Sequence, residues 1–304
     1  MTSNAPAPPR SRALLALTTV VLVLAASACI PKPGTQPISS PPAPSGCITD
    51  VGPATKLVVT GCGGDITYNV SVPTRCTTHA CGLILDVHGW TMSGDIQERN
   101  TQIAAIGREE GFIVVQPTAP GSPPSWDSSH YPFVADFVEL AVDVWRVDTR
   151  RVHVTGFSQG GAMTNWMRCN RTELFASAAP TAMSGSACAN GNNMPTMYVQ
   201  GLNDVFVSQA AIDATIASYV NGYGLDRSVV IFDEGGVVDT AYGSSTPGTP
   251  VFETVIHNHT SNGVVGHCVL GAPDPADPYG CDQATDRTHG RLIVDFFLRN
   301  PRAS

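Results

Sequence analysis

The clearest candidate for chemistry is a serine in the stretch "RVHVTGFSQGGAMTNWM", which runs from Arg151 to Met167. Within it, residues 156–160 form a G-x-S-x-G pattern centred on Ser158. This pattern often occurs by chance, so its surroundings decide whether Ser158 is a nucleophile or an ordinary turn residue. An apolar, strand-like run precedes it and a helix-like stretch follows it. This setting predicts a nucleophile elbow, with the Ser158 hydroxyl exposed where a strand turns into a helix.

A serine hydroxyl is a weak nucleophile, so it needs a base to take its proton and an acid to orient that base. Asp204 follows the strand-like run "YVQG" and is our candidate acid, with Asp233 and Glu234 as rivals at the end of the next apolar run. In one known chain order the acid follows the serine and the histidine comes last. The histidines in the right part of the chain are His257, His259, His267 and His289. Chain order alone leaves the base open between His267 and His289.

Acyl transfer also needs two backbone N–H groups that stabilise the oxyanion of the tetrahedral intermediate. Gln159 follows the candidate nucleophile, so its amide is one candidate donor. The stretch "LILDVHGWTMSG" provides an earlier strand followed by a glycine-containing loop, and we expect the amide of Trp90 to be the second donor. Trp126 is expected either to line the substrate pocket or to pack within the core or the loops.

Composition limits the partners of this chain. Its 304 residues are 42% hydrophobic, which suffices for one large core or two modest ones. The formal net charge is −8, and the only lysines are Lys32 and Lys56. Phosphate binding needs clustered cations, so nucleic acid is not expected as a partner. No C-x-x-C pair is present, and the chemistry above needs neither a metal nor an organic cofactor.

The first residues are expected to direct export. Two arginines precede an uncharged run over residues 13–28, which is typical of a secretory signal and shorter than the roughly 20 residues of a membrane span. The run ends in "AASAC", which resembles the lipobox of bacterial lipoproteins, although Ala26 stands where leucine is more usual. Residues 1–28 are therefore expected to be a lipoprotein-type signal peptide and Cys29 the lipidated residue. Simple secretion is the alternative.

Beyond this signal we expect a linker and one domain. Residues 29–45 are rich in Pro and Ser and predict an extended, disordered linker that holds the domain away from a membrane. The domain covers residues 46–304. Eight cysteines remain apart from Cys29, an even number that suits an oxidising compartment. We expect neighbours in sequence to form four disulfides: Cys47–Cys62, Cys76–Cys81, Cys169–Cys188 and Cys268–Cys281.

Apolar runs that alternate with helical patterns indicate the fold class. The runs typical of strands buried on both faces are Leu83–Val87, Gly111–Pro117, Val152–Thr155, Met197–Gln200, Val229–Phe232 and Val251–Ile256. Helical spacing predicts helices over Val134–Trp145, Gly161–Asn170 and Thr288–Asn300. The alternation predicts an α/β fold with a mostly parallel sheet and helices on both faces. Residues 48–72 are expected to add antiparallel strands at the N-terminal edge.

Most of the chain from Cys81 to Asn300 resembles the secreted polyhydroxybutyrate depolymerase and feruloyl esterase group of α/β-hydrolases, which is related to acetylxylan esterases. "LDVHGW" resembles its oxyanion loop, and "VDTRRVHVTGFSQGGAM" resembles its nucleophile block. "MYVQGLNDVFV" resembles its H-G-x-x-D-x-x-V acid block, although Gln200 stands where histidine is usual. "GHCVLG" resembles its G-H-C/T-W-P-G block, with Val-Leu in place of Trp-Pro. The resemblance implies the α/β-hydrolase fold and favours His267 over His289 as the base.

The resemblance also implies a reaction, the transfer of an acyl group from an ester to water. Ser158 would attack the carbonyl, His267 would move the proton, and Asp204 would orient the imidazole. Polyester, feruloylated xylan and acetylated glycan all stay open as substrates. A serine peptidase and a non-catalytic binding lipoprotein on a hydrolase scaffold are the other interpretations. The expected location is extracellular or on the cell envelope, with a lipid anchor as the only membrane contact.

Overall fold

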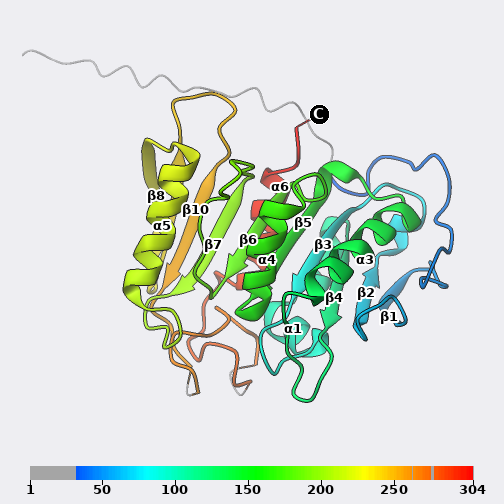
Figure 1. Ribbon diagram of the computed structural model, residues 1–304, viewed down its shortest axis with the longest axis horizontal. Coiled ribbons are helices and arrows are strands. Elements are labelled where there is room, and N and C mark those ends of the chain that lie inside the picture. Colours follow the sequence, from blue (N-terminus) through cyan, green and yellow to red (C-terminus); the bar gives the residue numbers. More distant parts are fainter. Residues whose placement is uncertain (1–31, 262, 275–276, 304) are drawn as a thin grey trace, which may run out of the picture. The chain divides into compact units, whose positions relative to one another are not determined.

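One mixed sheet forms the centre of the domain. The computed structural model describes residues 32–261, 263–274 and 277–303. In this part of the chain ten strands are ordered β1-β2-β4-β3-β5-β6-β7-β10-β9-β8 (Figure 1). The six from β4 to β10 in that order are parallel, and antiparallel pairs flank them at both edges. The strands are β1 Ala54–Val59, β2 Thr67–Val72, β3 Gly82–Val87, β4 Phe112–Thr118, β5 Val152–Phe157, β6 Ser177–Thr181, β7 Thr196–Gly201, β8 Arg227–Glu234, β9 Val237–Gly243 and β10 Phe252–His257.

Helices cover both faces of this sheet. α3, α4 and α5 lie on one face, and α1, α2 and α6 lie on the other (Figure 1). Their bounds are α1 Gly94–Thr101, α2 Ile103–Glu110, α3 His130–Val144, α4 Gln159–Asn170, α5 Gln209–Tyr223 and α6 His289–Arg299. No helix in the described residues has the length and apolar character that a bilayer span requires. The predicted α/β architecture, with antiparallel strands β1 and β2 at the N-terminal edge, is confirmed.

The far edge of the sheet differs from the sequence prediction. The run Val229–Phe232 is a strand, but it belongs to an antiparallel edge strand rather than to a buried parallel one. Val229, Val230 and Ile231 are each more than half exposed. Among the described strands, β8 pairs only with β9. The sequence prediction did not include β9. Helix α5 packs against β10, which lies further inside the sheet. Apolar composition predicted the strand correctly and its burial wrongly, because burial depends on which elements cover it.

The four predicted disulfides are confirmed: Cys47–Cys62, Cys76–Cys81, Cys169–Cys188 and Cys268–Cys281. Each closes a short loop, with sequence separations between 5 and 19 residues. Cross-links of this kind stabilise a domain chiefly by restricting the unfolded chain. Cys268–Cys281 closes a loop that begins next to His267.

The described part of the expected linker follows the domain instead of leading away from it. Gly34 donates to the carbonyl of Ala80, and Ala80 donates back to the carbonyl of Gln36 at 2.7 Å. Further along, Ala43 donates to the carbonyl of Val144. Several backbone groups between residues 34 and 43 are therefore hydrogen-bonded to the domain, which differs from the extended linker predicted for residues 29–45. The signal peptide and Cys29 lie outside the described residues.

Four histidines are buried in this core, and none of them forms an ion pair within the described residues. They are His88, His153, His257 and His289, each at most 2% exposed. Burial lowers the pKa of His88 and His257 to about 4 and that of His153 and His289 to about 3. His153 stacks on Phe297 with ring centroids 4.6 Å apart and shares a 2.8 Å hydrogen bond with the Ser177 hydroxyl. These rings are thus held neutral in the folded protein.

Stability is expected to fall in mild acid because unfolding lets such a histidine bind a proton. For His153, the stabilisation is fully present above the unfolded pKa of about 6.5 and is lost toward the folded value of about 3. Urea denaturation of wild type and His153→Gln at pH 7 and pH 5 tests this. Wild type should lose about 2 kcal/mol more than the variant over that interval. Equal losses in the two proteins would contradict the assignment.

Candidate active site

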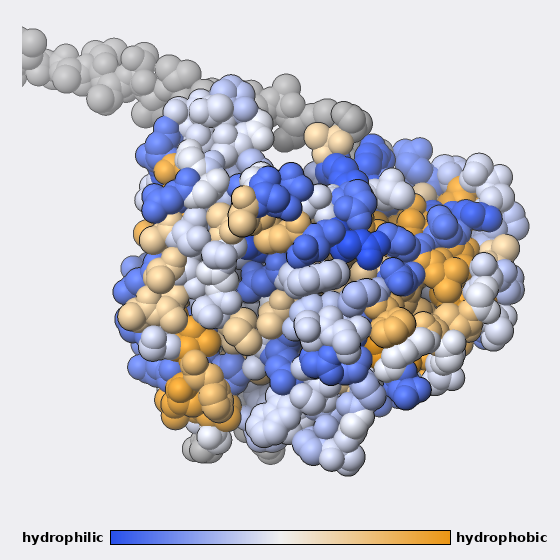
Figure 2. Space-filling model, in the orientation of Figure 1, coloured by the Kyte–Doolittle hydropathy of each residue, from blue (hydrophilic) through white to orange (hydrophobic). Residues whose placement is uncertain are grey.

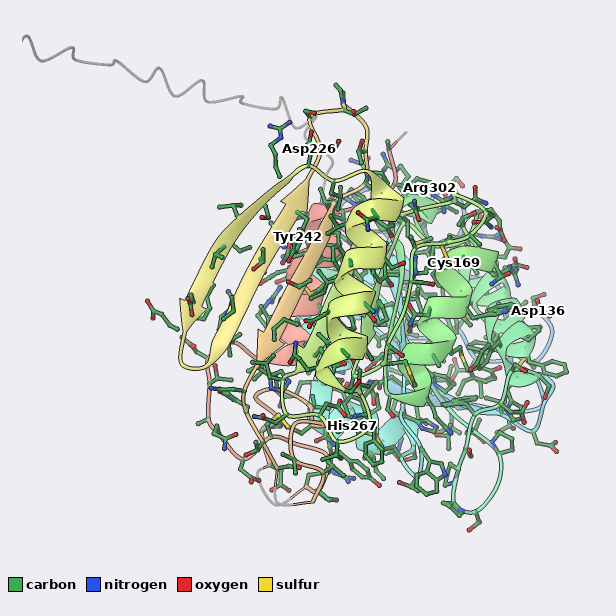
Figure 3. The ribbon with its side chains drawn as sticks, turned by 60° about the vertical axis from the view of Figure 1, so that its left-hand side comes forward. Asp136, Cys169, Asp226, Tyr242, His267 and Arg302 are labelled. Carbon is green, nitrogen blue, oxygen red and sulfur yellow. A yellow bond between two sulfur atoms is a disulfide. The ribbon has the colours of Figure 1, made fainter. Side chains whose placement is uncertain are left out.

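The site lies where the order of the parallel strands reverses. β3 pairs with β4 on one side and with β5 on the other, so the connections after β3 and β5 leave the sheet in opposite directions. Ligands of open α/β sheets bind in the crevice that such a reversal creates at the carboxyl ends of the strands. The loop after β3 carries Trp90, and the turn after β5 carries Ser158. Figure 3 shows His267 among the loops at this end, with Asp226 and Arg302 at the opposite end.

Ser158 occupies a strained turn between β5 and α4. Its φ of 54° and ψ of −114° lie in a region that residues with side chains rarely adopt. The turn is fixed by hydrogen bonds from the Ser158 N–H to Thr181 and from the Ala162 N–H to the Ser158 carbonyl. A Cβ on Gly160 would lie 2.0 Å from the carbonyl oxygen of Val87, so only glycine allows α4 to begin this close to β3. These features match the predicted elbow.

Ser158, His267 and Asp204 form a continuous line of hydrogen bonds. The Ser158 Oγ lies 3.0 Å from His267 Nε2, and His267 Nδ1 lies 2.8 Å from Asp204 Oδ2. His267 comes from the long segment between β10 and α6, and Asp204 comes from the loop after β7. The structure therefore brings together three side chains that are up to 109 positions apart in sequence. In this geometry the imidazole can accept the serine proton while a carboxylate faces its other nitrogen.

Asp204 is surrounded by donors. Oδ1 accepts the backbone N–H groups of Phe206 at 2.7 Å and Val207 at 2.9 Å. Oδ2 accepts from Gln200 Nε2 at 2.7 Å in addition to His267. Burial by itself raises the pKa of the Asp204 carboxyl, but the hydrogen bond and charge of His267 and the two amides outweigh it, so the pKa is lowered. Asp204 is thus held ionised beside the imidazole.

The acid and base loops are joined directly. Asp204 and Val265 form an isolated antiparallel bridge, and the Gly266 N–H donates to the Asn203 carbonyl at 3.1 Å. A Cβ on Gly266 would lie 2.6 Å from the backbone of Asn203, so glycine permits this close approach. The ring of Phe206 stands edge-on to His267, with centroids 4.8 Å apart. These contacts fix the imidazole between the acid and the serine.

The loop after β3 is held by a buried histidine. The Ala119 N–H donates to His88 Nε2 at 3.0 Å, so the proton of the neutral ring is on Nδ1, which donates to the Gly89 carbonyl at 2.6 Å. No hydrogen bond in the described residues engages the backbone N–H of Trp90 or that of Gln159. Both N–H groups are therefore without a protein acceptor in the described structure, as an oxyanion hole requires.

Trp126 has a supporting position. It is 5% exposed, and its indole N–H donates to the His88 carbonyl at 3.0 Å. Its backbone N–H donates to the Gln159 side chain at 3.0 Å. This burial speaks against the interpretation that Trp126 lines the substrate pocket. The alternative that it packs among the loops agrees with the structure, where it ties the loop after β3 to the start of α4.

The rival candidates lie elsewhere. His289 is buried at the start of α6, and its Nε2 has no partner among the described residues. His257 ends β10, and Asp233 and Glu234 lie exposed on the edge strand β8. None of these four is hydrogen-bonded to Ser158 or His267 in the described structure. The sequence did not predict that Gln200 would donate to Asp204. It showed only that glutamine stands here in place of the histidine that is usual in the resembled acid block.

Comparisons with known proteins agree with this architecture. No protein-family profile matches the chain. It is 30% identical to acetylxylan esterase A of Talaromyces purpureogenus over 202 residues, which cover 60% of this chain and 52% of that protein. It is 26% identical to acetylxylan esterase A of Aspergillus ficuum over 178 residues, which cover 53% of this chain and 58% of that protein. The chain thus spans less than two thirds of the length of these relatives.

Among solved structures, an acetyl xylan esterase from Aspergillus awamori matches with a TM-score of 0.58 and 19% identity. The match covers 80% of this chain and 98% of that one. The chain has the α/β-hydrolase fold. In this fold a serine on the turn after the central strand, an acid on a later strand loop and a histidine near the last helix meet at one edge, as they do here.

Proposed function

We propose that this protein is a serine carboxylic ester hydrolase that works through an acyl-enzyme. The observation that carries the proposal is the line from Ser158 Oγ through His267 to Asp204, with contacts of 3.0 and 2.8 Å. Ser158 attacks the ester carbonyl while His267 takes its proton and passes it to the leaving alcohol. Water then attacks the acyl-enzyme. His267 takes a proton from this water and returns it to the Ser158 oxygen as the acid is released. The amides of Trp90 and Gln159 stabilise the oxyanion in both steps.

Exposed apolar side chains around this line favour a hydrophobic ester. Trp90 is 57% exposed, Val205 58% and Phe206 70%, and they belong to the oxyanion and acid loops. Figure 2 shows a hydrophobic patch below α5, at the end of the sheet where these loops lie. Apolar surface of this kind suits a polyester chain or an aromatic acyl group better than a hydrated acetylated glycan. We therefore propose a polyhydroxybutyrate depolymerase-like or feruloyl esterase-like activity.

A second candidate is an acetylxylan esterase. The specific observation in its favour is that the curated relatives described above carry that name. Both candidates use the same serine chemistry and differ only in the acyl and alcohol parts of the ester. The substrate, and not the mechanism, therefore separates them.

Export is part of the proposal. Four disulfides form only where the compartment is oxidising, so they support an extracellular or cell-envelope location. We further propose that Cys29 carries a lipid anchor.

The triad is tested by hydrolysis of p-nitrophenyl butyrate. Ser158→Ala and His267→Ala should each lower kcat by roughly 10⁴-fold or more, because the nucleophile or its base is lost. His289→Ala is the matched control and should keep most of the activity, since His289 contacts neither Ser158 nor His267. Wild type that turns over no faster than Ser158→Ala would refute the esterase proposal. Loss of activity in His289→Ala with retention in His267→Ala would refute the choice of base.

The substrate is tested with polyhydroxybutyrate film, methyl ferulate, acetylxylan and a p-nitroanilide peptide substrate. We expect turnover of the film or the ferulate to exceed that of acetylxylan and of the amide. Val205→Ser should lower kcat/KM for the preferred hydrophobic ester roughly tenfold, because apolar contact area is lost. The same variant should change p-nitrophenyl acetate hydrolysis much less. Preference for acetylxylan would select the second candidate, and rapid amide cleavage would indicate a peptidase.

The anchor is tested by fractionating cells that express the full chain. Wild type should sediment with membranes and enter the detergent phase, whereas Cys29→Ser should be soluble, because a lipid chain supplies the membrane affinity. Equal membrane association of the two proteins would contradict lipidation at Cys29.

A further inference from the structure

The line of hydrogen bonds at the site continues beyond Asp204 into the core. Gln200, near the end of β7, donates from Nε2 to Asp204 Oδ2 at 2.7 Å, the same oxygen that faces His267. Tyr198 lies two residues earlier, on the same face of the strand, and donates its hydroxyl to Gln200 Oε1 at 3.1 Å. Gln200 is 1% exposed and Tyr198 is fully buried. Neither side chain reaches the substrate crevice.

We propose that Gln200 is a positioning residue that limits how strongly Asp204 holds the protonated form of His267, and that Tyr198 fixes the direction of the Gln200 amide. This inference rests on the proposed triad. It assigns a role to the position where the chain departs from the resembled acid block.

The direction of the amide follows from its partners. Oε1 accepts the Tyr198 hydroxyl, and Nε2 donates both to Asp204 and to the Gly201 carbonyl at 3.2 Å. The flipped amide would place an oxygen against the Asp204 carboxylate and its NH₂ group against the tyrosine hydroxyl. It would therefore lose a hydrogen bond to a charged group in a buried place, which is costly.

The consequence for the base follows from charge. Oδ2 of Asp204 accepts two hydrogen bonds, one from Gln200 and one from His267. A donor that stabilises the carboxylate makes it a weaker partner for an imidazolium ion. If Gln200 no longer donates, Asp204 attracts the charged imidazole more strongly, and His267 keeps its proton to higher pH. Since the base must be neutral to accept the serine proton, activity then begins at higher pH.

The other titratable groups around Asp204 do not obscure this readout. His257 approaches from β10, and burial lowers its pKa to about 4, so it is neutral in the working range. Tyr198 approaches from β7, and burial raises its pKa far above that range. Asp204 itself stays ionised because its pKa is lowered. The acid limb of the rate profile, that is, the rise of kcat/KM with increasing pH, therefore reports the base and not these three groups.

The experiment measures kcat/KM for p-nitrophenyl butyrate against pH. Gln200→Met keeps the side-chain length and removes the donor, and the midpoint of its acid limb should rise by about one pH unit. Its plateau kcat should fall roughly tenfold, because the carboxylate is less firmly held. Tyr198→Phe should shift the limb in the same direction by a smaller amount, because the amide is then free to turn.

The matched control is Gln116→Met. Gln116 is also a buried strand glutamine that donates to a buried carboxylate, Asp86 Oδ2, at 2.9 Å, and it has no contact with the triad. This variant should lose stability and keep the wild-type limb, which separates a general packing effect from a specific one.

The possible failures are distinguishable. If wild type has no ester turnover, the proposed function fails. If wild type is active and folded Gln200→Met keeps the wild-type limb, the positioning role fails. If Gln200→Met does not fold, Tyr198→Phe decides, and an unmoved limb in that variant overturns the inference. If the midpoint of the acid limb shifts by the same amount in Gln116→Met as in Gln200→Met, the positioning role of Gln200 is also overturned.

Discussion

The contact between the first turn of α4 and the backbone of β3 is the constraint on which the site depends. Gly160 lies against the carbonyl of Val87, and a Cβ on Gly156 would lie 2.5 Å from the backbone of Gly160. Because both positions lack a side chain, the helix begins directly above the sheet. The chain must then turn within one residue, which forces Ser158 into its positive φ. The hydroxyl is thereby raised between the loop after β3, which carries the Trp90 amide, and the first turn of α4, which carries the Gln159 amide.

The turn at Ser158 forms part of a site only because loops from distant parts of the chain meet beside it. The acid loop and the base loop meet at the bridge between Asp204 and Val265. The base segment is closed by Cys268–Cys281, and Tyr279 within that loop shares a 2.6 Å hydrogen bond with the Thr91 hydroxyl. The oxyanion, acid and base loops are thus tied to one another as well as to the sheet. Such ties hold a line of hydrogen bonds within the few tenths of an ångström that proton transfer requires.

The sequence predicted the parts of this arrangement that follow from local rules. The elbow at Ser158 was readable because glycine spacing, a strand and a helix adjoin it, and the chain order of acid and base limited the remaining candidates. The disulfides were readable because each joins neighbours in sequence. The exposure of β8, the burial of Trp126 and the course of residues 32–45 were not readable, because each depends on a partner far away in the chain. β6 was missed because Ser177–Thr181 is short and has no large aliphatic residue.

Two buried aspartates show why the composition of a hydrogen-bond shell matters more than its size. Asp86 accepts from Gln97, Thr101 and Gln116, yet burial, with the nearby charge of Glu98, raises its pKa to about 6. Asp204 also accepts from a glutamine, but its other donors are two backbone amides and an imidazole that can carry charge, and its pKa is lowered. Neutral side-chain donors alone do not offset the cost of burying a carboxylate beside another acid. Of these two aspartates, only Asp204 is therefore suited to act as the permanent anion that a triad requires. Among the residues that the structure describes, the Gln200 amide is the side-chain donor that shares this Asp204 oxygen with the imidazole.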